Sequence, residues 1–297
     1  MLIALLVPIA LATLLFSIVL IKAAIAKRAG PTAETMALGA VVSFFDTLGI
    51  GSFAPTTAWL KFRRLVPDRK IPPTILVGLT TPAVVASVIF LKQLGVKVDP
   101  VLLVGCVVAC LMGGLIGAPL VHRTRVWIVQ LIVAVGLLAA ATAYAMTNLH
   151  MFPGGGTLSS LSPALTILAI VANFLFGVLL NYGVGNYAPT LVILSLMGMD
   201  PRLCFPIMAG AAALMGAGAG VRHINTGQLD LRVVIGLTIG SIPAVFIAAY
   251  IVVTMPLELL RWLVLVVVLY AAAIMLHAAL LGRREHQAED ATAHVTA

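Results

Sequence analysis

Hydrophobic residues along this chain come in long runs, and polar residues collect in short segments between the runs. Residues 126–146 and 259–281 form two such runs, each long enough as an α-helix to cross a hydrocarbon layer about 30 Å thick. A membrane β-strand would instead show about ten residues of alternating polarity, and this sequence has no such segment. The pattern therefore predicts a bundle of transmembrane α-helices.

One eight-residue motif occurs twice. Residues 49–56 read Gly-Ile-Gly-Ser-Phe-Ala-Pro-Thr, and residues 183–190 read Gly-Val-Gly-Asn-Tyr-Ala-Pro-Thr, 134 positions later. Weaker echoes follow in the same order, pairing residues 75–78 with 207–210, 98–99 with 229–230, and 125–127 with 261–262. The chain is therefore predicted to be a duplicated unit preceded by one extra transmembrane helix at residues 1–28.

Basic residues indicate the orientation of these segments, because Lys and Arg concentrate in cytoplasmic loops. Basic groups lie at residues 27–28, 61–70, 122–125, 222–223 and 283–284. The apolar segment 34–60 has such a group on each flank, so we expect a re-entrant hairpin that turns at Gly49 and Gly51, where glycine permits the turn. A single crossing, the second choice, would put the two flanking groups on opposite faces.

The resulting fold class is an all-α polytopic membrane protein built as an inverted repeat. Each half has a re-entrant broken-helix hairpin and three transmembrane helices, which with the N-terminal helix makes about seven spans and two hairpins. The first repeat, 34–146, has hairpin 34–60 and helices 71–91, 99–121 and 126–146. An external loop, 147–162, precedes the second repeat, 163–282, with hairpin 163–196, helices 203–221, 230–253 and 259–281, and a cytoplasmic tail, 283–297. Inverted repeats with interrupted helices are typical of secondary transporters.

Composition narrows the classes of protein. The chain is 62% hydrophobic and 9% charged, which excludes an ordinary soluble domain. The net charge of +8 is explained by the cytoplasmic loops, so no nucleic-acid partner is expected. The three cysteines have no metal-ligand spacing, and no cofactor-binding motif or catalytic triad is present, so we predict no metal, no cofactor and no enzymatic activity.

Residues 1–26 lack the basic start of a signal peptide, so we expect them to remain as a helix. The N-terminus is then expected outside, and the C-terminus in the cytoplasm.

The two copies of the motif predict an anion site. In each copy a glycine pair is followed by a residue suited to cap a helix, Ser52 or Asn186, and then by a proline suited to the first helical turn. Two helix N-termini that face one cavity would attract an anion without a buried Lys or Arg. The candidate substrate-binding residues are Gly49, Gly51, Ser52, Phe53, Thr56, Thr57, Asn181, Tyr182, Gly183, Gly185, Asn186, Tyr187 and Thr190. The alternative is that the glycines allow close helix packing and the hydroxyls satisfy the broken backbone.

A few further residues are candidates for supporting roles. Asp46 is an acid inside an apolar segment, so it is a candidate for proton coupling, and the alternative is that it braces the hairpin turn. Thr80 and Thr81 are candidates to line the cavity, or they bond to their own helix. His223 beside Arg222 is interpreted as an anchor at the membrane interface.

With these glycine turns and repeats, residues 34–282 resemble the sulfite exporter TauE/SafE family of bacterial membrane permeases. The resemblance implies export of sulfite, thiosulfate or an organosulfonate across the inner membrane, and it implies a homodimer. Family members commonly carry a glycine triplet, whereas this chain has Ser52 and Asn186 at the third position. The family's binding role is therefore carried over only to Gly49, Gly51, Gly183, Gly185 and the residues that immediately follow them.

The leading hypothesis is a secondary carrier whose partners are a small sulfur-containing anion and the lipid bilayer. One alternative is a passive anion channel, which would show neither saturation nor proton coupling. Another is a membrane enzyme or a non-transport partner of a sulfur-metabolism enzyme, which would require a reactive residue at one of the glycine turns. The last is a purely structural subunit, which the two interruptions disfavour.

Overall fold

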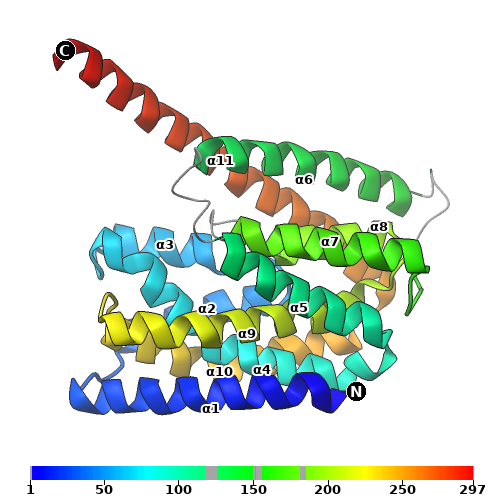
Figure 1. Cartoon of the computed structure of the whole chain (residues 1–297), viewed down its shortest axis with the longest axis horizontal. Helices are drawn as coiled ribbons and strands as arrows, with labels where there is room; N and C mark the ends of the chain where they lie inside the picture. Colours follow the sequence, from blue (N-terminus) through cyan, green and yellow to red (C-terminus); the bar gives the residue numbers. More distant parts are fainter. Residues whose placement is uncertain (1, 118–125, 150, 152–155, 181–184, 297) are drawn as a thin grey trace.

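The structure is a computed structural model, and it describes residues 2–117, 126–149, 151, 156–180 and 185–296. These residues form an all-helical bundle without β-strands, as the sequence predicts (Figure 1). The α-helices are α1 (Leu2–Ala26), α2 (Ala33–Thr47), α3 (Phe53–Phe62), α4 (Ile71–Gln93), α5 (Pro100–Gly117), α6 (Val126–Asn148), α7 (Pro163–Leu180), α8 (Tyr187–Leu196), α9 (Pro201–Thr226), α10 (Leu231–Thr254) and α11 (Leu257–Thr296), with short 3-10 helices at Asp68–Lys70 and Gly95–Lys97.

Eight helices in the described part of the chain are long and apolar enough to cross a membrane: α1, α4, α5, α6, α7, α9, α10 and α11. Seven of them correspond to the predicted spans. The eighth is α7, whose 18 residues were expected to form the first arm of a hairpin. Large apolar side chains such as Leu11, Ile132 and Leu168 are more than half exposed on the outside of the bundle, as expected where helices face lipid. The protein is therefore a multi-pass membrane protein.

The two broken segments, α2–α3 and α7–α8, each begin and end close together in space. At the outer ends of α2 and α3, the Glu34 carboxylate accepts hydrogen bonds from Arg63 Nε at 2.8 Å and from Trp59 Nε1 at 3.2 Å. Just before α7 and after α8, the N–H of Leu158 donates to Gly198 O at 3.1 Å, and the N–H of Asp200 donates to Leu158 O at 3.0 Å. Because the two chain ends of each segment meet at these contacts, the break between its two helices lies on the opposite side of the segment.

Each broken segment packs against a helix from the other half of the chain: α2 lies along α10, and α7 lies along α5. Both pairs approach so closely that glycine is required at the contact. A side chain at Gly240 would collide with the carbonyl of Met36, and one at Gly177 would collide with the carbonyl of Cys110. Because α4 also packs on α9 and α6 on α11, the two halves are interlocked rather than merely adjacent.

The C-terminal end differs from the predicted tail. The last predicted helix was expected to end at residue 281 and to be followed by a tail from residue 283, but α11 continues as a helix to Thr296 (Figure 1). The final part of α11 projects beyond the rest of the bundle in Figure 1. Long side chains such as Glu, Arg and Gln in this segment have good intrinsic helix propensity, which is the physical reason for the difference.

Candidate functional site

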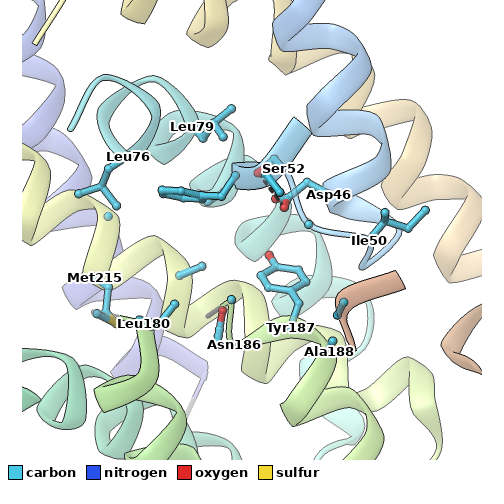
Figure 2. Close-up of a pocket in the computed structure, with 18 of the residues that line it drawn as sticks. Asp46, Ile50, Ser52, Leu76, Leu79, Leu180, Asn186, Tyr187, Ala188 and Met215 are labelled. Atoms are coloured by element: carbon cyan, nitrogen blue, oxygen red, sulfur yellow. Dashed lines mark hydrogen bonds between the residues drawn. The ribbon is translucent and has the colours of Figure 1, made fainter. Parts of the chain in front are cut away.

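A cavity of about 470 Å³ lies where the two broken segments meet (Figure 2). Its walls come from the α2–α3 break, the start of α8, and faces of α4, α9 and α11. The two copies of the repeated motif, far apart in sequence, therefore border one space. A volume of this size suits a small molecule.

The first break is a glycine turn. Gly49 and Gly51 have φ angles of +98° and +87°, in a region of backbone conformation that residues other than glycine rarely adopt. The turn redirects the chain so that α3 begins at Phe53. Ser52 occupies the N-cap position, but its side chain does not cap the helix, so the predicted capping role is wrong.

The hydroxyl of Ser52 instead donates to Asp46 Oδ1 at 2.9 Å, across the glycine turn. The reason is geometric: the two glycines fold the chain back so that the last turn of α2 lies beside the start of α3. This contact corresponds to the bracing alternative for Asp46. The carboxylate also lines the cavity, so a role toward the substrate remains compatible with the brace.

The second break uses the same motif differently. Asn186 occupies the N-cap position of α8, but again no side-chain cap forms, so this expectation is wrong too. Its Nδ2 donates to the carbonyl of Met208 on α9 at 3.4 Å, because the α8 start packs tightly against α9. Gly185 does not have a left-handed φ, unlike its counterpart Gly51.

The starts of α3 and α8 both face the cavity. The first backbone hydrogen bond of α3 runs from the N–H of Thr56 to Ser52 O, and the first of α8 runs from the N–H of Thr190 to Asn186 O. The preceding N–H groups, including those of Ala54 and Ala188, have no carbonyl one turn earlier in their helices. Both of these residues line the cavity. Backbone donors from two helix N-termini are thus directed at one space, the arrangement that favours a bound anion.

Figure 2 shows Tyr187 from α8 with its hydroxyl directed toward Asp46 and Ser52 from the other break. Tyr187 is buried, with 8% of its surface exposed. The hydroxyl, the carboxylate and the serine therefore gather between the two helix starts.

The cavity brings together nine of the predicted residues: Asp46, Gly49, Gly51, Ser52, Phe53, Thr80, Gly185, Asn186 and Tyr187. Four others do not line it: Thr56, Thr57, Thr81 and Thr190. Two of these hydroxyls serve the local structure, since Thr56 donates to Ser52 O at 2.6 Å and Thr190 donates to Asn173 Oδ1 at 3.2 Å. Thr80 bonds to Leu76 O at 2.8 Å, as in the back-bonding alternative. Asn181, Tyr182 and Gly183 lie outside the described residues.

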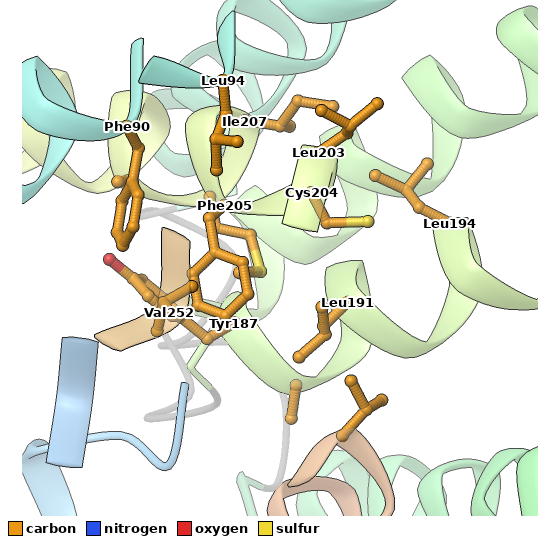
Figure 3. Packing of buried hydrophobic residues seen from close by; sticks show 14 of the residues in the cluster. Phe90, Leu94, Tyr187, Leu191, Leu194, Leu203, Cys204, Phe205, Ile207 and Val252 are labelled. Carbon is orange, nitrogen blue, oxygen red and sulfur yellow. The ribbon is translucent and has the colours of Figure 1, made fainter. Parts of the chain in front are cut away.

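The cavity occupies only one end of the α4–α9 pair. These helices are linked at one end by the bond from the N–H of Asp230, after α9, to Thr74 Oγ1 at 2.9 Å. At the other end the rings of Phe90 and Phe205 pack with centroids 5.1 Å apart, within a dense cluster shown in Figure 3. Most of the residues of α4 and α9 that line the cavity come from the halves nearer Thr74 and Asp230, and Ala83 and Ala212 lie just beyond the middle of their helices. Phe90 and Phe205 do not line the cavity.

The two short helices differ in burial. Eight of the ten residues of α8 are buried beneath α6, α9 and α11, whereas α3 has only two buried residues, Thr56 and Leu60. Phe53 is 45% exposed, while Tyr187, its counterpart in the motif, is 8% exposed. The two breaks are thus unequal: neighbouring helices cover the start of α8, whereas α3 is largely exposed on the outside of the bundle.

Among the lining residues that sequence reasoning missed, His223 is the one with an ionisable side chain in the described part of the wall. It was interpreted as an interfacial anchor, yet it lines the cavity together with Ala219 and Met215, one and two helical turns earlier on α9. The spacing of these three positions, four residues apart, could have indicated the shared face. Their distance from the motif in sequence gave no reason to connect them with it.

The chemistry of the cavity is mainly apolar with a few polar groups. Among the described residues that line it, none is Lys or Arg, and the ionisable side chains are Asp46, Tyr187 and His223. No group of three or more His, Cys, Asp and Glu residues in the described part of the chain could hold a metal ion. The three cysteines are buried in α5 and α9 and do not line the cavity.

Comparison with known proteins identifies the second half of the chain. Residues 155–296 match the family model described as Sulfite exporter TauE/SafE, which confirms over this segment the family that the sequence resembles. The matched segment runs from α7 to α11, and it contains the second motif and half of the described residues that line the cavity. No curated protein and no solved structure matches the chain.

Proposed function

We propose that this chain, a member of the sulfite exporter TauE/SafE family over its residues 155–296, is a secondary transporter that exports a small sulfur-containing anion. Sulfite, thiosulfate and organosulfonates are the candidate substrates. The observation that carries the proposal is the cavity between the starts of α3 and α8, where two sets of backbone N–H groups converge without a lysine or arginine in the described wall. Such donors bind an anion by partial charge and still allow it to leave.

The proposed topology places both broken segments as re-entrant hairpins in inverted repeats. The contacts of Glu34 with Arg63 and of Leu158 with Gly198 support a return of each segment to its starting side. Each broken segment packs against a helix of the other half, α2 on α10 and α7 on α5, and this reciprocal packing supports two equivalent halves. In the inner membrane, the open end of the cavity would then face the cytoplasm, where the basic residues of segment 61–70 lie. The homodimer implied by the resemblance stays a prediction.

A carrier agrees with the cavity better than a passive channel does. A channel requires a continuous pathway, whereas the buried cluster around Phe90 and Phe205 fills the other end of the α4–α9 pair. Release on the other side would require this end to open and the α3 end to close. In secondary transporters such alternation occurs by movement of one repeat or bundle against the other.

Flux into proteoliposomes tests the proposal. We expect purified protein to transport sulfite, thiosulfate or methanesulfonate with saturable kinetics. Asn186→Leu should reduce this flux, because it removes the contact with Met208 and places an apolar side chain at the start of α8. Size-exclusion chromatography of the variant would verify that it remains folded. Wild-type flux equal to that of empty liposomes for every anion would refute the carrier, and flux without saturation would favour the channel.

A further inference from the structure

His223 is an ionisable side chain of the cavity wall. It lies near the end of α9, and the wall around it includes Pro72 and Pro73 at the start of α4. The hydrogen bond from Asp230 to Thr74 shows that these two helix ends lie together. An anion that entered the cavity between these two helix ends would pass the imidazole before it reached the starts of α3 and α8.

The imidazole is available for a ligand. His223 is half-buried, and no described residue forms a hydrogen bond with its ring. Its neighbour Arg222 is exposed on the same helix and does not line the cavity. Two N–H donors on a protonated imidazole, or one on the neutral ring, would suit an oxyanion.

The cavity otherwise offers no cationic side chain among its described lining residues, and Asp46 contributes a carboxylate that would repel an anion when ionised. An N–H donor of the imidazole would partly offset this repulsion along the entry path. The two helix starts would then hold the anion deeper in the cavity.

We propose that His223 is a specificity-determining residue that captures the oxyanion at the mouth of the cavity and directs it to the starts of α3 and α8. This inference rests on the proposed transport function. It concerns binding from the open end, so it predicts an effect on KM rather than on the maximal rate.

Three variants test it by methanesulfonate flux in proteoliposomes, with substrate supplied to the face on which the cavity opens. His223→Gln should raise the apparent KM about tenfold, the loss expected for one hydrogen bond to a charged group, with the maximal rate largely kept. His223→Lys supplies N–H donors and a positive charge in place of the imidazole and should return KM toward the wild-type value. Arg222→Gln is the matched control, because it removes a neighbouring charge outside the cavity and should leave KM unchanged.

The outcomes separate this inference from the transport proposal. Wild-type protein without flux refutes transport itself, whereas wild-type flux with an unchanged KM in His223→Gln refutes only the role of His223. An equal rise in KM for Arg222→Gln would indicate a general surface-charge effect and would also overturn the inference. If His223→Gln does not fold, KM in His223→Lys and in His223→Asn decides: the same rise in both overturns the proposal.

Discussion

At the residue scale, Asp46 has two roles that can be separated by substitution. Its carboxylate accepts the hydrogen bond from Ser52 and also lines the cavity. Asparagine keeps an oxygen that accepts the Ser52 bond but cannot ionise, whereas leucine removes both properties. The comparison of the two variants therefore distinguishes a brace from a proton-binding group.

We expect Asp46→Asn to fold normally and to lose the part of the pH dependence of flux that this carboxylate contributes. In the wild type, a carboxylate that ionises as pH rises would repel the anion, so apparent affinity should fall with rising pH. The apparent affinity of the variant should fall less with rising pH, and the remaining dependence would come from His223, which lines the same cavity. Methanesulfonate is the appropriate substrate because its charge does not change over this pH range. A pH profile identical to that of the wild type would exclude Asp46 from proton coupling.

The two motif glycines Gly51 and Gly185 are expected to respond differently to alanine. Gly51 has a φ of +87° in open space, so Gly51→Ala meets no side chain but strains the backbone, at a cost of about 1–2 kcal/mol. Gly185 also has open space but lacks the left-handed φ, so Gly185→Ala should change stability by less than about 0.5 kcal/mol. Thermal unfolding in detergent measures both. Equal destabilisation would contradict the backbone explanation.

At the element scale, α3 and α8 share a sequence motif but have different surroundings. α8 is enclosed by α6, α9 and α11, and α3 contacts mainly α2 and α4. If transport alternates which of the two short helices is enclosed by its neighbours, the present structure shows the state in which α8 is enclosed and α3 is exposed.

This difference predicts unequal costs for truncating the matched aromatic residues Phe53 and Tyr187. Tyr187→Ala should lower the free energy of unfolding by about 3–5 kcal/mol, because it leaves a cavity in the cluster that contains Phe90 and Phe205. Phe53→Ala should cost about 1 kcal/mol or less, since the side chain is 45% exposed. Denaturation in detergent provides the comparison. Similar costs would show that α3 is enclosed as tightly as α8.

At the scale of the whole molecule, the halves are held together by close helix contacts. Gly177 on α7 packs directly on the backbone of α5 at Cys110, and Ser43 on α2 donates to Ser241 on α10 at 2.7 Å. Small residues at membrane helix interfaces allow such approach. The position of each break, and hence the cavity, depends on these contacts.

Gly177→Ala should therefore destabilise the protein by about 1–3 kcal/mol, because the added methyl group overlaps the α5 backbone. Gly136→Ala on α6 is the control, since nothing lies within 4 Å of an added Cβ there, and alanine favours a helix. Thermal unfolding in detergent should separate the two variants. A Gly177→Ala variant as stable as the control would mean that α5 and α7 are not in close contact.

The helices were largely predictable from the sequence because the length of an apolar run and the absence of charge are local properties. The predicted span 71–91 became α4 at Ile71–Gln93, and 230–253 became α10 at Leu231–Thr254. The break at Gly49 and Gly51 was also predictable, since a left-handed backbone favours glycine regardless of what surrounds it. The resemblance to the TauE/SafE family, which the match over residues 155–296 bears out, was visible for the same reason, because the motif is contiguous.

Tertiary structure alone decided the partners of the polar side chains and the burial of each copy of the motif. Ser52 turns to Asp46 and Asn186 turns to Met208, although both were expected to cap helices. His223 joins the cavity only because α9 packs beside α4. Hydrogen-bond partners and burial depend on segments distant in sequence, so two nearly identical motifs acquire one enclosed and one open environment.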